Sequence, residues 1–221
     1  SMNINFTAVW PYLPQLFKGV LVTLQVAAMA AIGGTVLGFG LSMGGRKGSP
    51  VRMLVKGIVD FFRGTPLLIQ LTFFHIGLPQ ITGWIPKLFV SALIVFSLKS
   101  GAYLSEILRA GIESIDKGQI EAAHALGVKN TDITFSIILP QAIRNVLPAI
   151  MNEFITLVKE TSVVSVIGLS DLMRKTQLIS AATYRYFEPY LITMVIYLVL
   201  NIILSFIGKK LERALSYDQA H

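Results

Sequence analysis

Five apolar stretches, each about as long as a membrane-crossing helix, leave this chain few ways to fold. They occupy residues 17–43, 53–78, 88–110, 140–167 and 188–208. A helix needs roughly 20 apolar residues to cross the hydrocarbon core of a bilayer, and each stretch is that long. Only 14% of the residues are charged, whereas soluble domains carry about 25%. The sequence therefore predicts a single all-α membrane domain over residues 1–221, a polytopic protein with five transmembrane helices.

Cysteine and histidine usage limits the chemistry that the chain can perform. It has no cysteine, which excludes disulfides and thiolate metal sites, and its three histidines are scattered. We therefore expect no metal site, no bound cofactor and no catalytic constellation. The net charge of +7 would suggest nucleic acid as a partner of a soluble protein. Here we expect no nucleic acid, and basic residues at the membrane surface instead.

The second apolar stretch contains residues that interrupt a helix. Pro66 cannot donate a backbone hydrogen bond and Gly64 weakens the same turn, so we expect a kink or break there. Such a break is tolerated in a membrane where protein or a water-filled cavity satisfies the freed backbone groups. We expect Arg63 to anchor the break or to pair with an acid elsewhere.

The fourth apolar stretch carries ionisable residues, which are costly at membrane depth and usually face the bundle interior or a pathway. Glu153 and Glu160 are about 20° apart around a helix, and two carboxylates on one face suit a cation. Lys159 either pairs with one of them or reaches a ligand's carboxylate. The candidate substrate-binding residues are Glu153, Glu160, Lys159, Thr156, Thr161 and Ser162, with Leu67, Gln70 and Thr72 from the broken second stretch. A proton or Na⁺ would also fit the two acids, and a Glu–Lys pair that only locks the bundle is the structural alternative.

A polar segment at 111–139 separates the third and fourth stretches. Asp116 and Gln119 have the spacing of a capping box, Gly127 is placed to end the helix that follows, and the residues 130–132 offer a second N-cap. The segment is therefore expected to be a short helix, a sharp glycine turn and a second helix. By itself this pattern also fits an ordinary capped loop helix.

Two motifs give the chain a resemblance to a known family. Glu121, Ala122, Ala123 and Gly127, followed by Ile137, Leu139 and Pro140, match every fixed position of the signature loop of ABC importer permeases. The residues 61–71, 111–115 and 117–119 resemble the branch that takes up polar amino acids of the histidine, glutamine and arginine type. The resemblance runs from Gly19 to about Leu211.

The resemblance implies a type I importer permease in a bacterial inner membrane. The segment 111–139 would be its cytoplasmic coupling loop, with Glu121, Ala122, Ala123 and Gly127 contacting an ATPase. The chain has no phosphate-binding loop, so ATP and Mg²⁺ would belong to that separate ATPase subunit. Further implied partners are a second permease subunit, identical or related, an extracellular or periplasmic amino-acid-binding protein, the amino-acid substrate and membrane lipid.

Basic residues indicate the orientation in the membrane. Eleven of the 19 lysines and arginines lie on the same side as the polar segment, and five lie on the other side. The positive-inside rule therefore predicts an outer N-terminus and a cytoplasmic C-terminus.

Two other functions compete with ATP-driven import of a basic amino acid by alternating access. A secondary transporter or ion channel would use Glu153 and Glu160 as a proton or cation path, but such transporters often show internal repeats, and we find none. A membrane-embedded enzyme would need a nucleophile, base or metal constellation, which the sequence lacks.

Overall fold

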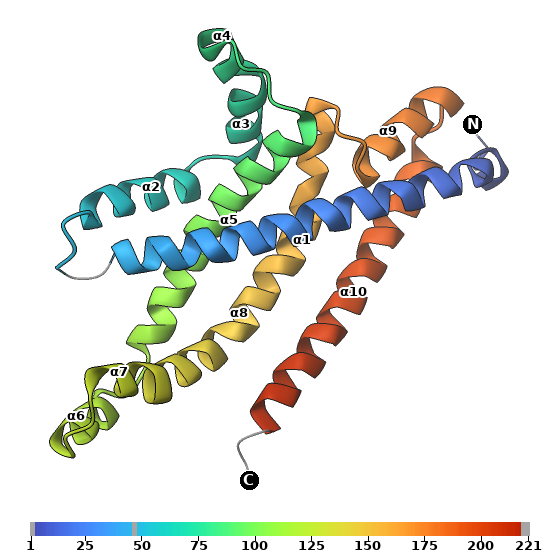
Figure 1. Ribbon diagram of the computed structural model, residues 1–221. Helices are drawn as coiled ribbons and strands as arrows, with labels where there is room; N and C mark the ends of the chain where they lie inside the picture. Colours follow the sequence, from blue (N-terminus) through green and yellow to red (C-terminus); the bar gives the residue numbers. More distant parts are fainter. Residues whose placement is uncertain (1–2, 46–47, 218–221) are drawn as a thin grey trace.

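The computed structural model describes residues 3–45 and 48–217, with side chains to residue 214. Arg46 and Lys47, two of the eleven basic residues on the side of the polar segment, lie outside the described residues. His221 also lies outside them. The described chain is helical throughout, without strands (Figure 1). Its helices are α1 (Leu13–Gly44), α2 (Arg52–Gly64), α3 (Leu67–Thr72), α4 (Leu78–Thr82), α5 (Leu88–Glu113), α6 (Lys117–Ala125), α7 (Asn130–Asp132), α8 (Leu139–Glu160), α9 (Leu172–Thr183) and α10 (Phe187–Tyr217).

Irregular helical turns join several of these elements. The wider π-type turns η3 (Phe73–Gly77) and η4 (Ile133–Ile138) connect α3 to α4 and α7 to α8. The tighter 3-10 segment η5 (Thr161–Ile167) continues α8, and η1 (Phe6–Ala8) and η2 (Trp10–Tyr12) precede α1. The polar segment therefore runs into the fourth apolar stretch as one helical path, without the boundary at residue 139 that we expected.

Four helical stretches of the described chain are long and apolar enough to cross a membrane: Phe6–Gly44, Leu88–Glu113, Asn130–Ile167 and Phe187–Ala214. They correspond to the first, third, fourth and fifth predicted stretches. The second is interrupted between α2 and α3, where Thr65 and Pro66 are extended, with ψ of 148° and 135°. The predicted break is thus confirmed, and it leaves a short apolar helix over Leu67–Thr82.

Two segments that lie between the predicted stretches contain helix. The residues 79–87 begin inside α4, and the residues 168–187 hold all of α9. Asp171 caps α9 by accepting a hydrogen bond from the Arg174 backbone N–H. An N-cap of this kind is a local signal that we missed.

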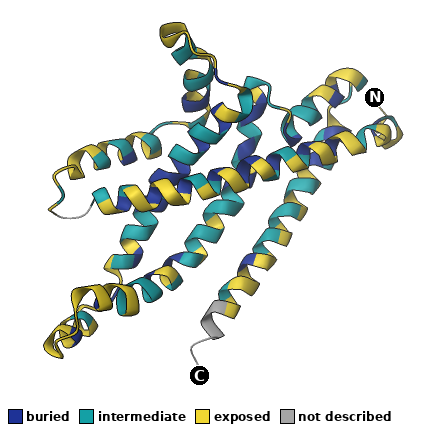
Figure 2. Ribbon diagram, in the orientation of Figure 1, coloured by how far each residue is buried: buried dark blue, intermediate teal, exposed yellow. Residues whose placement is uncertain are grey.

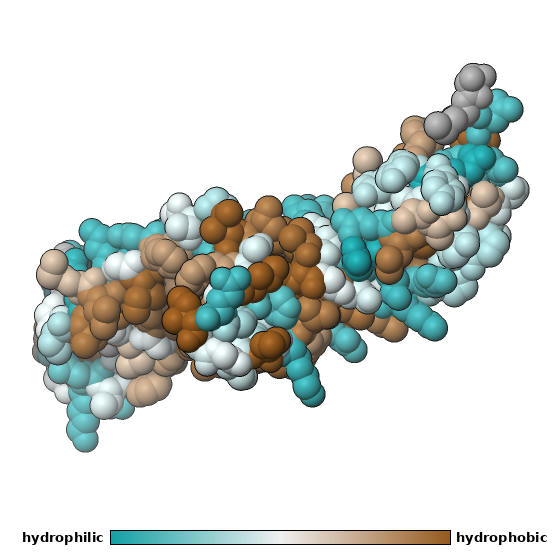
Figure 3. Space-filling view, turned by 90° about the horizontal axis from the view of Figure 1, so that it is seen from above, coloured by the Kyte–Doolittle hydropathy of each residue, from teal (hydrophilic) through white to brown (hydrophobic). Residues whose placement is uncertain are grey.

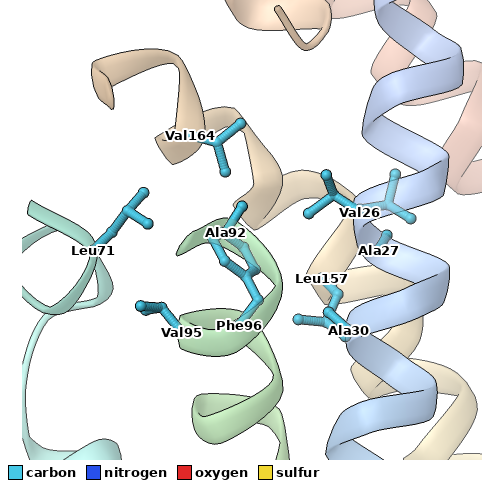
Figure 4. Close-up of a cluster of buried hydrophobic side chains, with 10 residues drawn as sticks. Val26, Ala27, Ala30, Leu71, Ala92, Val95, Phe96, Leu157 and Val164 are labelled. Atoms are coloured by element: carbon cyan, nitrogen blue, oxygen red, sulfur yellow. The ribbon is translucent and has the colours of Figure 1, made fainter. Parts of the chain in front are cut away.

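The centre of the bundle is formed where α1 crosses α5 (Figure 1). Small residues permit the close approach: a Cβ added to Gly34 would lie 2.7 Å from the Ser100 Cβ, and one added to Gly101 would lie 2.9 Å from the Leu37 Cβ. Such contacts are typical of packed membrane helices. Figure 4 shows the resulting core, in which Ala27 and Ala30 of α1 face Phe96 of α5 and Leu157 of α8.

Large apolar side chains remain exposed outside this core. Along α10, Leu198, Ile202 and Phe206 are each more than half exposed, and Figure 2 shows exposed residues along this helix and along α1. Figure 3 shows hydrophobic residues gathered over much of one face of the molecule. An exposed apolar surface of this extent fits contact with lipid or with other membrane subunits.

Candidate functional site

An ion pair joins two helices at the centre of the bundle. Lys99 of α5 donates to the Glu160 carboxylate at the end of α8. The Lys99 side chain is 10% exposed and that of Glu160 is 29% exposed, so the pair is largely withdrawn from solvent. Burial at this depth makes each charge dependent on the other.

Glu153 lies beside this pair. The charges of both Lys99 and Glu160 act on its carboxylate, and its Oε1 is buried without a hydrogen-bond donor among the described residues. Lys99 therefore forms an ion pair with Glu160 and acts on Glu153 only through its charge. As the seven-residue spacing predicts, both glutamates meet on the same side of α8.

Lys159 does not pair with either glutamate in the structure. It is exposed and makes no ion pair within the described part of the chain. The expectation of a local Glu–Lys pair on α8 is thus corrected: Lys99, from a different helix, occupies that role. An i,i+1 neighbour on a helix points elsewhere, whereas α5 packs directly against α8.

The hydroxyl groups predicted for the site differ in accessibility. Thr161 is fully buried, and its hydroxyl donates to the Val158 carbonyl, 2.8 Å away, where α8 tightens into η5. Thr156 is half-buried and bonds to the Asn152 carbonyl at 2.9 Å. Ser162 is half-buried. In this conformation Thr161 therefore shapes the end of α8, and the other two stand nearer the surface.

Gln70 occupies the break between α2 and α3. Its Nε2 donates to the Phe62 carbonyl at 3.1 Å and to the Thr65 carbonyl and hydroxyl at 3.1 and 2.6 Å. It thereby satisfies backbone oxygens that the helix break releases, as a break at membrane depth requires. The Gln70 Oε1 remains buried without a partner among the described residues.

The other two candidates from this region lie on either side of Gln70. Leu67 packs against the central core. Thr72 lies with Leu68, Ile69 and Val166 on a mostly apolar groove of about 480 Å³ between α3 and η5. The groove brings the broken second stretch to the end of the fourth, as we expected, although Gln70 itself points into the break.

A second group of charges lies at the far end of α5. Arg109 donates to Glu106 and Glu113, both at 2.8 Å. Arg63 lies 3.7 Å from Glu106 and 5.4 Å from the centre of the Tyr103 ring, which Lys99 approaches from 5.2 Å. Arg63 does therefore pair with an acid elsewhere, on α5.

The polar segment presents most of its motif to solvent. Glu121 and Ala122 are exposed on α6, whereas Ala123 is buried. Gly127 has a φ of +76°, which confirms the predicted left-handed helix end. Leu126 beside it is 84% exposed, an apolar side chain at the tip of a polar segment.

The capping pattern of this segment was only partly predicted. Asp116 caps α6 through the Gly118 N–H at 2.8 Å, but the Gln119 side chain bonds to Gln141 and does not complete a capping box. The expected second cap is wrong, because Lys129 precedes α7 and no side chain caps it. The bond to Gln141 ties α6 to the start of α8.

Sequence reasoning missed the importance of Lys99. The available signal was a lysine inside an apolar stretch, which usually has a buried partner. Its partner, Glu160, is 61 residues away in the sequence, and no local spacing rule connects the two. Among the described residues, no group of three or more His, Asp or Glu side chains is placed to hold a metal ion.

The amino-acid sequence is similar to those of known transport proteins. The residues 37–217 match the family model described as "Binding-protein-dependent transport system inner membrane component". The arginine transport system permease protein ArtQ of Bacillus subtilis is 48% identical over 218 residues, covering 97% of this chain and 98% of that protein. The glutamine transport system permease protein GlnP of Escherichia coli is 35% identical, covering 96% and 98%.

Solved structures agree on the fold. The crystal structure of an amino acid ABC transporter with histidines superposes with a TM-score of 0.91 at 37% identity, over 96% of this chain and all of that one. An inward-facing MetNI methionine ABC transporter gives a TM-score of 0.78 at 22% identity, a likeness of fold alone.

Proposed function

The chain belongs to the family of binding-protein-dependent transport system inner membrane components, and from this premise we propose that it translocates a polar, basic amino acid such as arginine, lysine or histidine. It is an ABC transporter permease with several apolar helices. Its proposed assembly comprises a second permease subunit, identical or related, an ATPase subunit that carries ATP and Mg²⁺, and an external amino-acid-binding protein. Family membership does not favour the alternative of a secondary transporter or ion channel.

The observation that carries the choice of substrate is the charge balance at the bundle centre. Lys99 pairs with Glu160, while Glu153 forms no ion pair and its Oε1 lacks a donor among the described residues. A guanidinium, ammonium or imidazolium group would supply both the donor and the missing positive charge. The arginine named for the Bacillus subtilis relative agrees with such a cation.

The remaining candidates take separate roles in this proposal. The exposed Lys159 and the half-buried Ser162 and Thr156 would receive the polar backbone groups of the amino acid. Thr72 and Leu67 would line the opposite wall. Gln70 and the buried Thr161 would hold the break and the end of α8 in place and contact the ligand only after these segments move.

We propose that transport follows alternating access. Five spans, with the broken second stretch counted as one, would place the N-terminus outside and the C-terminus in the cytoplasm. The segment 111–139 would be the cytoplasmic coupling loop. ATP binding would close the ATPase subunits, draw the two α6 helices together and switch the side to which the pathway opens. Exposed Glu121 and Leu126 at the tip of the segment support a contact with a partner there.

Uptake of labelled arginine and glutamine by the reconstituted transporter tests the substrate assignment. Glu153→Gln removes a charge without breaking the Lys99–Glu160 pair. We expect it to lower arginine uptake relative to glutamine by roughly 10-fold, the value of one hydrogen bond to a charged group. Glu160→Gln should act in the same direction and also destabilise the fold, because Lys99 loses its partner.

Two matched variants sharpen this test. Lys159→Gln should weaken arginine and glutamine equally, since it would contact the part that both share. Glu113→Gln makes the same chemical change in an exposed side chain at the far end of α5 and should change neither. An unchanged arginine-to-glutamine ratio in Glu153→Gln, with a lowered melting temperature, would instead support a purely structural role.

The coupling loop is tested by a pair of substitutions at Gly127. Its φ of +76° is strained for a branched residue and tolerated by asparagine. We expect Gly127→Val to lose ATPase association or uptake by roughly 10-fold or more, and Gly127→Asn to retain both. Glu121→Lys should also uncouple transport, whereas Asp132→Lys, the same charge change on α7, should have a smaller effect. Normal uptake in both Gly127→Val and Glu121→Lys would contradict the assignment.

A further inference from the structure

A cleft of about 900 Å³ lies between the end of α1, the length of α2, and the adjoining parts of α5 and α6. It is separate from the Lys99–Glu160 pair and from the groove beside η5, since it shares no lining residue with either. Figure 1 shows α2 running beside the end of α1, and α5 crossing α1 and continuing towards α6. The cleft is therefore not part of the proposed substrate site.

The charges around the cleft are unevenly balanced. Its acids are Asp60, Glu106 and Glu113, and its basic residues are Arg52, Lys56, Arg109 and Lys117. Arg109 is shared by the two glutamates. The other three basic residues are exposed and form no ion pair within the described ranges. The lining therefore has one more basic residue than acidic residues. Three of its basic side chains are free to bind an anion.

The start of α2 adds to this positive potential. The helix begins at Arg52, and no side chain caps its first turn. Uncapped N–H groups at a helix start carry partial positive charge and favour an anion. Arg52, Lys56 and this helix end thus act together on one side of the cleft, with Lys117 at the start of α6 as a further basic group on its wall.

Apart from Ser42 and Ser105, the uncharged side chains of the wall are apolar. Leu41 of α1, Val55 and the buried Val59 of α2, and Ile112 of α5 line it, with the buried Ile115 and half-buried Ile120. A small hydrated anion gains nothing from such a wall. A ligand with an anionic head and an apolar tail would use both surfaces, and basic pockets between transmembrane helices on the cytoplasmic side suit anionic lipid headgroups.

We propose that this cleft binds an anionic phospholipid of the cytoplasmic leaflet, with its phosphate between Arg52, Lys56 and Lys117 and an acyl chain along Val55, Val59 and Ile112. The inference rests on the proposed placement of the α6 side in the cytoplasm. The bound lipid would join α2, which leads into the broken helix, to α6 of the coupling loop. Phosphate chemistry alone could also come from a soluble phosphate monoester, so the experiment separates the two sources.

Native mass spectrometry of the purified, delipidated transporter complex measures this binding without reference to transport. The complex is titrated with dioleoyl-phosphatidylglycerol, dioleoyl-phosphatidylcholine and glycerol 3-phosphate. We expect one saturable phosphatidylglycerol site per permease chain, little binding of phosphatidylcholine and none of glycerol 3-phosphate. If the uptake assays contradict the amino-acid assignment, the lipid-binding result is unaffected. If no lipid binds, the uptake results are likewise unaffected.

Two triple variants with equal loss of charge test the site. Arg52→Gln/Lys56→Gln/Lys117→Gln removes the cleft cations, and Lys209→Gln/Lys210→Gln/Arg213→Gln removes three exposed cations of α10, none of which lines the cleft. At about five-fold per basic residue, we expect roughly 100-fold weaker phosphatidylglycerol binding in the first and little change in the second. Val55→Trp fills the apolar part without changing charge and should also weaken binding.

Three results would overturn the proposal. Equal losses in the two triple variants would indicate general attraction of a basic surface for anionic lipid. Glycerol 3-phosphate bound as tightly as the lipid, with no effect of Val55→Trp, would indicate a soluble phosphate ligand. No saturable lipid in the complex would indicate that the ATPase or the second permease chain fills the cleft.

Discussion

Glu160 and Asp171 are buried carboxyl groups only eleven residues apart in the chain, yet the protein accommodates them differently. Glu160, at the bundle centre, pairs with Lys99 of α5. Asp171, at the start of α9, is fully buried, and its Oδ1 accepts the Arg174 N–H at 2.8 Å. Its Oδ2 has no hydrogen-bond partner among the described residues. One acid is balanced by a charge, and the other is held only by backbone N–H groups.

The backbone at Asp171 packs closely against α1. A Cβ on Gly19 of α1 would lie 2.8 Å from the Leu172 Cα and 3.0 Å from the Asp171 carbonyl oxygen. The Leu172 N–H donates to the Thr23 hydroxyl at 3.2 Å. Contact this close leaves no room for a side chain at position 19, and no ion pair to Asp171 is formed among the described residues. Burial accordingly raises the pKa of Asp171, which lies outside the apolar spans, from 3.8 to about 6.

The largest expected effect comes from removing the cation of the paired acid. Lys99→Met leaves Glu160 and Glu153 without a positive partner, so we expect a loss of about 3 kcal/mol in the free energy of unfolding. The matched change Lys159→Met alters an exposed lysine on α8 and should stay within about 0.5 kcal/mol. Denaturant unfolding of the purified chain in detergent measures both. Equal effects would show that the buried pair is not what distinguishes the two lysines.

A double-mutant cycle measures how far this pair acts as a unit. Because Lys99→Met/Glu160→Met removes both charges, we expect it to recover much of the stability lost in the single variant, with a coupling energy of about 2 kcal/mol. The exposed Arg109–Glu113 pair should give only about 0.3–0.5 kcal/mol in the same cycle. A coupling energy at Lys99–Glu160 no larger than this would remove the distinction between the two groups of charges.

The contribution of Asp171 to stability should depend on pH. Because the folded state raises the pKa of Asp171 from 3.8 to about 6, its contribution to stability is fully present below pH 3.8 and is lost as the pH rises through 6. Asp171→Asn keeps an N-cap without the charge. We expect the variant to gain up to about 3 kcal/mol at pH 7 relative to the wild type.

The pH dependence of the difference between the two proteins isolates Asp171 from all other acids. The gain at pH 7 should shrink as the pH falls from 6 to 4. Asp132→Asn, at the exposed end of α7, provides the control and should show no such trend. A difference that does not change with pH would mean that folding does not raise the pKa of Asp171.

The smallest effect is expected at the exposed end of α5. Glu113, whose side chain is 58% exposed, shares Arg109 with Glu106, so Glu113→Gln should cost about 0.5 kcal/mol or less. Salt should remove this difference, since exposed pairs are screened within about 10 Å at 0.1 M ionic strength. A larger, salt-resistant loss would place this cluster with the buried pair.

Local features of the chain were predictable where neighbouring residues decide them. Pro66 lacks an N–H, so the second stretch had to break near it, and Gly127 could adopt the positive φ that ends α6. Helical spacing alone placed Glu153 and Glu160 on one side of α8. The family motif likewise depends on a short run of residues, from Glu121 to Pro140.

The sequence alone determined that this protein is an all-helical membrane domain with an acidic face and a broken helix, because apolar length, helical period and the absence of a proline N–H act within a few residues. The tertiary structure decided which groups pair with the acidic side chains and with the backbone oxygens of the broken helix. Lys99 reaches Glu160 from another helix, Gln70 donates to the backbone oxygens of the break, and α1 packs against the backbone at Asp171. The packing of the whole bundle decides which helices come within hydrogen-bond distance of one another, and this decides the partners.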